Sequence, residues 1–483
     1  MKLLPLLLSS ICWLTCLHPG SPASAQTFTQ LYSLTAAEGS PITGRILQAS
    51  DGNFYGTAQQ GGTNSVGTFF KLAADGTFTV LHSFGSVAGE GQYPNAGVIQ
   101  AIDGNFYGTT GAPGGGTIYK MTPAGMLTTL YTLGTQSTDG RFPYAPLVQS
   151  ADGTFYGVTY QGGPDDTGTI FKVTTNGTPG GTTFTTLHSF AAQAGGVNDE
   201  GANPYGPLIV GVDGNIYGTT YSGGANHHGT IFQITPAGAF TTLHVFSATE
   251  GECRGALVRD SSGVFYGTSS NQPQGSVFQF VTDGSMAGTA VTTLYSFTGG
   301  SDGGGFVAGV VINSDGDLYG VTLLNGANGN GTLFRLTPGG PLTTLHAFGA
   351  GSEEAQPHAG VIIGSDGNVY GTTKSTIFKL QPSSAVPPAP VHGGLSDTVF
   401  AVRKLPPATS GGDSVLHFSA RQSGTPEGLK VRVQVNNVPD NERNDWVDLN
   451  NGSGGYLTLD KTTGKFVLSA SNYPETSVIY FRA

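Results

Sequence analysis

The sequence predicts an all-β protein: a seven-bladed β-propeller closed by its N-terminal strand, followed by a small β-sandwich of immunoglobulin-like type. Three observations lead to this prediction. A short motif recurs seven times, each unit of about 50 residues divides into four short strands, and helical periodicity is absent. The composition agrees, because 77 of the 483 residues are glycine and 10% are aromatic, which suits frequent tight turns around an aromatic core.

Residues 1–25 have the features of an export signal. An apolar run follows Lys2, and Ala23-Ser24-Ala25 fits a small-residue cleavage site. The run is shorter than the ~20 apolar residues of a membrane-spanning helix, and no later stretch approaches that length. We therefore expect a protein that is secreted or displayed at the cell surface, without a transmembrane helix.

The charge and cysteine content indicate which partners and which stabilising interactions to expect. Only 11% of residues are charged, the net charge is −11 and no cluster of Lys and Arg is present, so nucleic acid is not an expected partner. Removal of the signal would take Cys12 and Cys16 with it and leave Cys253 alone. Stability is therefore expected to come from packing and not from an intrachain disulfide, and we expect a monomer.

The recurring motif reads Asp-Gly-x, an aromatic or aliphatic residue, Tyr-Gly, and Thr or Val. Asp-Gly is a strong signal for a tight hairpin, so each copy is expected to join two strands, and seven copies predict seven blades. The copies begin at Asp51, Asp103, Asp152, Asp213, Ser262, Asp315 and Asp366.

Each repeat is expected to form one four-stranded blade. In the second copy, the turn residues place strands at residues 96–101, 106–110, 116–122 and 127–133. Small residues open the first strands, as in Ala96-Gly97, which suits the axis where the blades converge.

The two ends of the repeat region complement each other. The chain opens with residues 28–34, which match the fourth strands of later units, whereas the seventh unit stops after its third strand at residues 376–380. We therefore expect the N-terminal strand to complete the last blade and remove its open edge.

The repeated elements DGNxYGTT, GTIFKLTPxG and TTLHSF occur in this order over about residues 28–380. In all three elements the chain resembles the GloVer tandem repeat of secreted, choice-of-anchor bacterial proteins (the Gloeo-Verruco repeat family). The resemblance implies an exported repeat protein of bacterial cell surfaces or their surroundings. It implies no established activity.

Two segments follow the propeller, which we expect to span residues 26–381. Residues 382–394 are expected to form a Pro-rich, stiffened linker. Residues 395–483 contain several runs with a period of two, as expected for the strands of a β-sandwich.

The connections between strands divide the propeller into two faces. First-to-second and third-to-fourth connections are tight and uniform, whereas fourth-to-first and second-to-third connections are long and variable. The variable connections must share one face, here called the variable face. Function is expected there, because a rigid scaffold carries these loops.

Polar residues that occur in one blade only are the first candidates for ligand contacts. Adjacent loop histidines would suit a metal or acid–base role, although such pairs more often stay solvated. The longest loop, residues 191–207, is the expected rim of a pocket. The candidates found in one blade only are His227, His228, His358, Asp165 and Asp166, and the longest loop adds Asp199, Glu200 and Tyr205.

A carboxylate follows the fourth strand of every blade. A ring of acids would form a negative funnel for calcium or a cationic ligand. An acid repeated in every blade also fits a carboxylate that accepts the N–H groups of its own turn, which is the interpretation we favour. The acids are Glu38, Glu90, Asp139, Glu200, Glu250, Asp302 and Glu353.

A second repeated position lies within the fourth strand and holds either histidine or tyrosine. The interchange of these two residues predicts amphipathic packing, not metal ligation. The residues are Tyr32, His82, Tyr131, His188, His244, Tyr295 and His346.

The sequence lacks a Gly-x-Ser-x-Gly elbow, a zincin helix, a phosphate-binding loop and a dinucleotide fingerprint. We therefore expect a binding or surface-interaction module, not an enzyme, whose ligand is a polysaccharide or another envelope component. One alternative is a lyase or glycosidase that uses acids such as Asp199, Glu200 or Asp302 with His227 or His228. A structural spacer is the second alternative. No cofactor other than calcium is considered.

Overall fold

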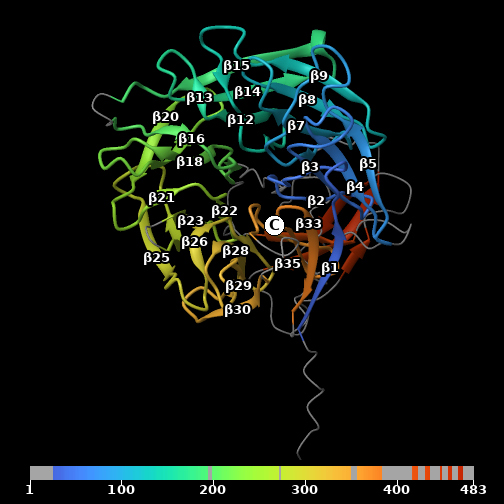
Figure 1. Ribbon diagram of the computed structural model, residues 1–483. Coiled ribbons are helices and arrows are strands. Elements are labelled where there is room, and N and C mark those ends of the chain that lie inside the picture. Colours follow the sequence, from blue (N-terminus) through green and yellow to red (C-terminus); the bar gives the residue numbers. More distant parts are fainter. Residues whose placement is uncertain are drawn as a thin grey trace, which may run out of the picture.

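The computed structural model describes residues 26–193, 198–270, 274–349 and 356–382, together with five strands after residue 415. Over these residues the regular structure is β, apart from one 3-10 turn at Pro179–Gly181. Seven sheets of four or five strands are arranged around a common axis (Figure 1). The fold is therefore a seven-bladed β-propeller, as the repeats predict.

Each blade is an antiparallel sheet whose strands run in chain order from the axis outward. Blade 1 contains β2 (Leu47–Gln48), β3 (Phe54–Ala58), β4 (Thr68–Leu72) and β5 (Phe78–Ser83), and blade 2 contains β6 (Ile99–Gln100), β7 (Phe106–Thr110), β8 (Thr117–Met121) and β9 (Leu127–Thr132). Blade 3 contains β11 (Val148–Gln149), β12 (Phe155–Thr159), β14 (Thr169–Thr175) and β15 (Thr182–Ser189), blade 4 contains β17 (Ile209–Val210), β18 (Ile216–Ser222), β19 (Thr230–Ile234) and β20 (Phe240–Val245), and blade 5 contains β22 (Val258–Arg259), β23 (Phe265–Ser270), β24 (Ser276–Val281) and β25 (Ala290–Ser296). Blade 6 contains β27 (Val311–Ile312), β28 (Leu318–Leu324), β29 (Thr332–Leu336) and β30 (Leu342–Ala347), and blade 7 contains β31 (Ile362–Ile363), β32 (Val369–Thr372), β33 (Thr376–Gln381) and β1 (Thr27–Ser33).

Short extra strands extend four blades where a loop returns toward the axis. β10 (Gly140–Arg141) pairs with β13 (Gln161–Gly162). β16 (Ala202–Pro204), β21 (Glu252–Cys253) and β26 (Gly304–Val307) pair with the ends of β18, β23 and β28. These additions lie at the variable face, where the second strand of each blade ends.

The innermost strands are shorter than the sequence predicts. Residues 96–101 were expected to form a strand, but β6 contains only two residues. Backbones of neighbouring blades meet at this point: a Cβ on Gly44 would lie 2.2 Å from the Gly97 nitrogen, and a Cβ on Gly206 would lie 2.8 Å from the Gly255 oxygen. The crowded axis therefore limits each inner strand to a brief pairing.

The two ends of the propeller share one sheet. β1 pairs antiparallel with β33, with Phe28 opposite Leu380 and Ser33 opposite Thr376. Blade 7 therefore contains three strands from the end of the repeat region and one from its beginning.

The core consists of layers between neighbouring blades. One such layer packs Tyr156 and Ile170 of blade 3 against Phe232 and Ile234 of blade 4, and all four side chains are buried. Burying apolar surface between sheets contributes roughly 25 cal/mol per Å². The ring is therefore stabilised by contacts between repeats as well as within them.

The Asp-Gly motif organises the inner half of each blade. In blade 1, Asp51 accepts hydrogen bonds from the Asn53 backbone N–H at 3.0 Å and from the Tyr55 hydroxyl at 2.8 Å. Gly56 faces Phe70 on the paired strand, and a Cβ there would lie 2.5 Å from the ring. Across all seven Tyr-Gly pairs, the corresponding third-strand aromatic side chain comes within 2.4 to 2.6 Å of this position. The motif glycine therefore makes room for a core aromatic.

Five strands are described in the C-terminal region. β34 (Leu416–Arg421), β35 (Lys430–Val435) and β36 (Trp446–Asp448) form one sheet, and β37 (Gly455–Leu459) pairs with β38 (Phe466–Ala470). A β-sandwich over residues 395–483 and the linker at 382–394 stay predictions. Among the described residues, no helix has the length and apolar character needed to cross a membrane.

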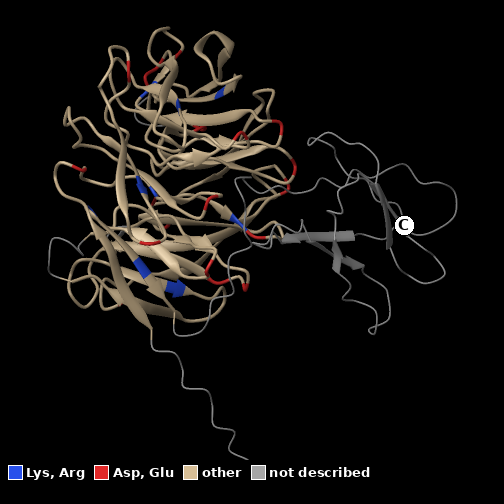
Figure 2. Cartoon of the chain, turned by 90° about the vertical axis from the view of Figure 1, so that its right-hand side faces the viewer, with Lys and Arg blue, Asp and Glu red and all other residues tan. Residues whose placement is uncertain are grey.

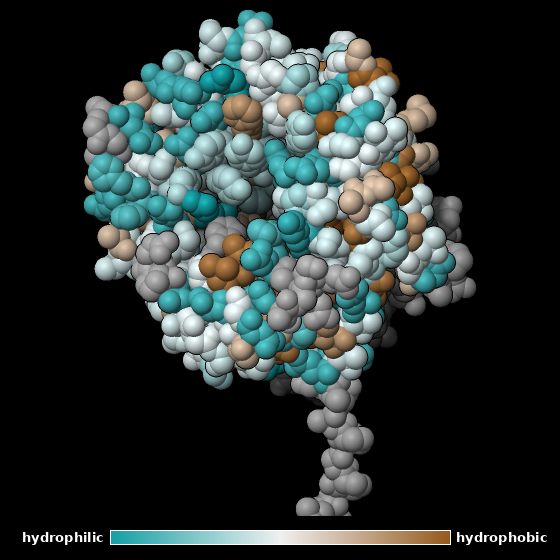
Figure 3. Space-filling view, in the orientation of Figure 1, coloured by the Kyte–Doolittle hydropathy of each residue, from teal (hydrophilic) through white to brown (hydrophobic). Residues whose placement is uncertain are grey.

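Charged and apolar side chains are dispersed over the described surface. Figure 2 shows few Lys and Arg residues, in separate places. On the face seen in Figure 3, apolar residues form only small groups among polar ones. The part of the surface in view therefore offers neither a basic patch nor a broad apolar one.

Replacing the motif glycine of blade 4, Gly218→Ala, should destabilise the propeller by about 1–3 kcal/mol, because the new methyl group overlaps the Phe232 ring. Thermal unfolding of the purified variant tests this. Gly180→Ala is the matched control, because a Cβ at Gly180 would meet nothing within 4 Å. Equal unfolding temperatures for the two variants would show that the glycine has no packing role.

Candidate functional site

The repeated carboxylates close the turns in which they lie. Glu250 accepts hydrogen bonds from the Ser247 backbone N–H at 2.8 Å and from the Ser247 hydroxyl at 2.7 Å. Its other oxygen lies 2.9 Å from His244 Nε2. The same arrangement, an acid bonded to the His or Tyr of the preceding outer strand, occurs in six blades: Tyr32–Glu38, His82–Glu90, Tyr131–Asp139, His188–Glu200, His244–Glu250 and Tyr295–Asp302. Glu353 of the seventh loop lies outside the described residues.

These bonds keep the acids ionised. Burial alone would raise the pKa of Glu250, but hydrogen bonds from Ser247 and His244 together hold it below its ordinary value of 4.5. The pKa of Asp302 is lowered in the same way, against the effect of burial, by bonds from Thr298 and Tyr295. Each carboxylate therefore has its partners within its own blade.

The acids do not converge on a shared site. Each lies in the loop of a different blade, and the described residues contain no group of three or more His, Cys, Asp or Glu placed to hold a metal ion. In the described part of the chain, the observed bonds favour a role for these acids in blade architecture.

The His or Tyr of the outer strand also connects neighbouring blades. Where the outer strand of the next blade has a phenylalanine among its first three residues, the two rings stack nearly parallel. The four stacked pairs are Tyr32–Phe78 at 4.3 Å, Tyr131–Phe184 at 4.3 Å, His188–Phe240 at 4.2 Å and His346–Phe28 at 3.7 Å between ring centroids. The last pair joins blade 6 to the N-terminal strand. These contacts explain why histidine and tyrosine interchange at this position.

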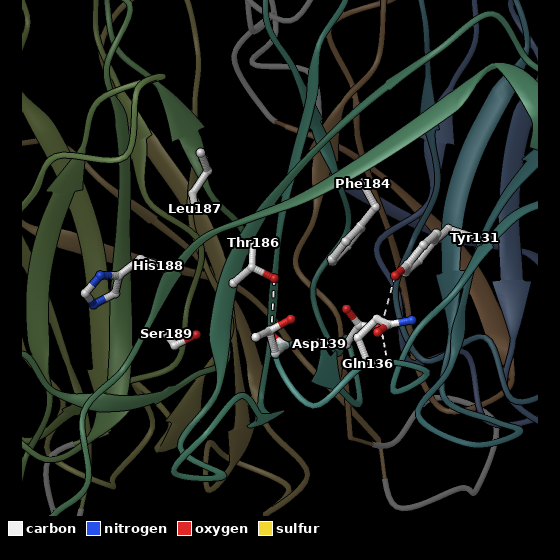
Figure 4. Close-up of a pocket in the computed structure, with 9 residues that line it drawn as sticks. Tyr131, Gln136, Asp139, Phe184, Thr186, Leu187, His188 and Ser189 are labelled. Atoms are coloured by element: carbon white, nitrogen blue, oxygen red, sulfur yellow. Dashed lines mark hydrogen bonds between the residues drawn. The ribbon is translucent and has the colours of Figure 1, made fainter.

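A cavity of about 480 Å³ opens at the rim between the outer strands of blades 2 and 3. Its lining includes Tyr131, Asp139, Phe184 and His188 (Figure 4). The polar groups there are already bonded, because Tyr131 donates to Asp139 at 3.0 Å and His188 pairs with Glu200. This cavity is therefore a gap between residues that hold the outer strands and their loops together, and we do not assign a ligand to it.

The candidates on the loops of blades 3 and 4 are mostly engaged locally or exposed. Asp166 accepts a hydrogen bond from Arg141 Nη2 at 2.7 Å, and Asp165 accepts one from the Ala192 N–H at 3.0 Å. Asp199 and His227 are exposed, and His228 is half-buried. The described contacts do not bring these residues together.

A more informative set lies around the mouth of the central channel. We define the mouth position of each blade as the residue four places before its innermost strand, where the chain arrives from the variable face. The residue type differs from blade to blade. The mouth positions are Thr43, Asn95, Tyr144, Tyr205, Arg254, Val307 and His358.

Three successive mouth positions form part of an aromatic cluster, here called the Tyr–Arg cluster. It comprises Tyr144, Tyr205 and Arg254 at mouth positions, together with Tyr160 and Tyr221 at the ends of second strands. Tyr205 lies 5.6 Å from Tyr144 and 6.1 Å from Tyr160 between ring centroids. The Arg254 guanidinium lies 3.9 Å above the centre of the Tyr221 ring. Residues of blades 3, 4 and 5 at positions that differ from repeat to repeat thus lie together at the channel mouth.

The cluster is accessible and has spare hydrogen-bonding capacity. Tyr205 is 37% exposed, although it lies among other aromatic rings. Arg254 Nη2 is 3.7 Å from Glu252, beyond hydrogen-bond length, and Arg254 Nε is buried without a hydrogen-bond partner among the described residues. A guanidinium carries five donors. The Nη groups of Arg254 pair only loosely with Glu252, so they are the donors left for a ligand.

Tyr144 and Tyr205 are neutral over the physiological range. Burial raises the pKa of Tyr144, and the neighbouring Tyr205 and Tyr160 add to the shift. Burial also raises the pKa of Tyr205, partly offset by Arg254. The cluster therefore presents uncharged aromatic faces with hydroxyl groups beside one cation, a combination that can stack on a sugar ring and bond its hydroxyls.

Only Tyr205 of this cluster was among the residues singled out from the sequence. Tyr144, Tyr160, Tyr221 and Arg254 were not identified, because each lies in a stretch that resembles its neighbours in the repeat. Superimposing the repeats on their inner strands and looking for the position that changes most would have found the mouth residues.

The model of the Gloeobacter/Verrucomicrobia repeat matches residues 21–197, 176–288 and 272–387, which together exceed half of the chain. The chain belongs to this family. The match confirms the resemblance seen in the three repeated elements. Comparison with curated proteins gives no match.

Solved structures similar to this Gloeobacter/Verrucomicrobia repeat protein show its fold alone. A fungal alcohol oxidase of the AA5 family, in complex with copper, has a TM-score of 0.51 and 12% identity, and the match covers 90% of this chain and 85% of that one. A Bacteroides thetaiotaomicron protein described as the extracellular domain of a hybrid two-component system has a TM-score of 0.49 and 11% identity. That match covers 74% of this chain and 41% of the other, so the chain spans less than half of that relative.

Removing the carboxylate that bonds to the outer strand, here called the acid latch, should lower the stability of this repeat protein in a pH-dependent way. The pKa of Glu250 is depressed on folding, so its contribution is present above the unfolded pKa and is lost as pH falls through the folded value. Glu250→Gln should therefore cost about 1–2 kcal/mol at pH 7, and the difference from the wild type should shrink near pH 3.

Urea unfolding at several pH values measures this difference. Asp199→Asn is the control, because it removes one negative charge from an exposed loop residue and should change stability by no more than about 0.5 kcal/mol. A Glu250→Gln deficit that does not vary with pH would contradict the latch.

Proposed function

We propose that the propeller is a binding module that holds a polysaccharide on its variable face through the Tyr–Arg cluster. One observation carries the proposal: four tyrosines and an arginine from three successive blades gather at the channel mouth, at positions where the repeat otherwise changes from blade to blade. Residues needed for blade architecture are the same in most blades. Residues that differ and cluster on an accessible surface are available for recognition.

The chemistry of the cluster suits carbohydrate. Tyrosine rings offer flat apolar surfaces for the C–H face of a sugar, and their hydroxyls bond to sugar hydroxyls. Arg254, held over Tyr221 and short of hydrogen-bond partners, adds directed donors. Neither a metal ion nor a cofactor is required for this mode of binding.

We propose binding without turnover. Two of the three acids considered for a lyase or glycosidase have other partners in separate blades: Glu200 pairs with His188 in blade 3, and Asp302 accepts a bond from Tyr295 in blade 5. The third, Asp199, is exposed. A glycosidase needs two carboxylates about 5–10 Å apart. The contacts of these acids support roles in holding loops.

We further propose that the protein works outside the cytoplasm, with residues 1–25 as its export signal. Polysaccharides and envelope components are found in that location. The proposal agrees with the family resemblance, and the C-terminal region would then be available for attachment as a separate β-sandwich.

We also propose that β1 is the latch that keeps the ring closed. Phe28 of β1 stacks on His346 of blade 6 and lies 5.3 Å from the Phe378 ring of blade 7. One side chain thus contacts two blades from the opposite end of the propeller, and β1 covers the edge of β33.

Phe28→Ala should destabilise the propeller by about 2–3 kcal/mol, toward the lower end for an aromatic truncation because Phe28 is half-buried. Thr29→Ala, an exposed neighbour on the same strand, is the control. Chemical unfolding measures both. Equal stabilities would show that the strand does not hold the ring.

Tyr205→Ala should weaken polysaccharide binding at least tenfold, because aromatic anchors typically contribute more than about 1.4 kcal/mol. Tyr93→Ala is the matched control: Tyr93 is exposed to 36%, like Tyr205 at 37%, but lies in blade 2 outside the cluster. Retention of the mature protein on a panel of immobilised polysaccharides, with assay for released oligosaccharides, is the measurement. Equal losses in both variants, or release of products, would overturn the proposal.

A further inference from the structure

Among the residues nearest the axis, one from each blade, a single side chain is positively charged. We define the axial position of each blade as the residue two places before its innermost strand. Six of the seven axial residues are small or cyclic and uncharged, and one is arginine. The axial positions are Arg45, Gly97, Pro146, Pro207, Ala256, Gly309 and Gly360.

The Arg45 side chain extends across the inner end of blade 7. A Cβ on Gly360 would lie 3.8 Å from Arg45 Cδ and 3.1 Å from the Gly309 oxygen. The arginine therefore reaches beyond its own blade, over glycines that leave room for it. The small axial residues elsewhere provide space that a ligand can enter.

Arg45 is accessible to solvent and has no acidic partner within the part of the chain that the structure describes. Its side chain is exposed, yet the surrounding protein lowers its pKa through desolvation. The two properties are compatible, because several blades surround the axis near this side chain while its end still reaches solvent. No hydrogen bond or ion pair of Arg45 is found among the described residues, although a guanidinium carries five donors.

Neighbouring groups on blade 7 add positive potential. Lys374 lies in the turn between β32 and β33, is exposed and has no ion pair within the described part of the chain. Its carbonyl accepts the Ile42 N–H at 2.9 Å, which joins blade 7 to the segment before Arg45. His358, the mouth residue of blade 7, is near enough to Lys374 for that lysine to contribute to its lowered pKa, mainly caused by burial. Within the described residues, neither Arg45 nor Lys374 forms an ion pair with an acid, so this sector has two cationic side chains available.

We propose that Arg45 makes the channel mouth a binding site for a carboxylate. A planar guanidinium matches a carboxylate in a two-pronged hydrogen-bonded pair. A singly charged group is favoured over a multiply charged one, because the protein carries a net charge of −11. The carboxylate belongs either to a free small acid or to an acidic sugar of the bound polysaccharide; only the second case rests on the proposed function.

Calorimetric titration of the mature protein, residues 26–483, distinguishes these sources. Galacturonate should bind and galactose should not at the same concentration if the ligand is a small acid. If the ligand is an acidic polymer, polygalacturonate should bind more tightly than its methyl ester. In either case Arg45→Met should weaken binding at least tenfold, and Lys71→Met, which removes the same charge far from the mouth, less than twofold.

Folding is checked separately. Because Arg45 has no partner among the described residues, Arg45→Met should unfold at the same temperature as the wild type or higher. A clear fall in unfolding temperature would overturn the inference by assigning Arg45 a structural role. Unchanged carboxylate binding in Arg45→Met, or no carboxylate binding by the wild type, would also overturn it. Loss of neutral polysaccharide binding in Tyr205→Ala would still support the proposed function, so the two failures are distinguishable.

Discussion

The packing of each blade against the next around a common axis is the constraint on which the structure depends. A blade must be thin enough on its inner side to fit beside its neighbours and must still contribute large side chains to the layers between blades. The Tyr-Gly pair meets both needs, because the glycine of β18, Gly218, accommodates the Phe232 ring from the paired strand. The tyrosine before it is tied to the hairpin aspartate, Asp213, at 2.9 Å. One short motif thus specifies the turn, the pairing and the aromatic layer of a blade.

The outer half of each blade depends on a second device that connects repeats. A carboxylate in the loop after the outer strand orients the His or Tyr of that strand. This ring in turn stacks on the next blade wherever the outer strand of that blade has a phenylalanine near its start. Because turn, acid and ring all serve the scaffold, these positions are not free to vary. Residues at the channel mouth make fewer such contacts. Variation is therefore concentrated there, where Tyr144, Tyr205 and Arg254 meet and where Arg45 reaches over Gly360 of the neighbouring blade 7.

The sequence was sufficient to predict the number of blades, because Asp-Gly and Tyr-Gly have fixed local roles that repeat. It was less informative where the partners are distant or exchanged. His188 and Glu200 are 12 residues apart whereas His244 and Glu250 are 6 apart. Both repeated positions could be recognised in the sequence, but their hydrogen bond could not, because the length of the loop between them varies. In blade 5, Ser262 replaces the hairpin aspartate, but Asp260 takes over the bond to the Tyr266 hydroxyl at 3.1 Å. The Tyr–Arg cluster was not predicted beyond Tyr205, since its members come from three blades and meet only in three dimensions.

The central claim is that ligand recognition occurs at the channel mouth. It does not occur on the opposite face, where the tight Asp-Gly hairpins lie, or at the cavity between the outer strands of blades 2 and 3. A crystal structure of the mature protein with a bound oligosaccharide tests it most directly. The account predicts a sugar ring against Tyr205 and Tyr160, with a hydroxyl or carboxylate within hydrogen-bond distance of Arg254 or Arg45. A sugar bound instead at the rim cavity between Tyr131 and His188, or on the uniform hairpins, would contradict it.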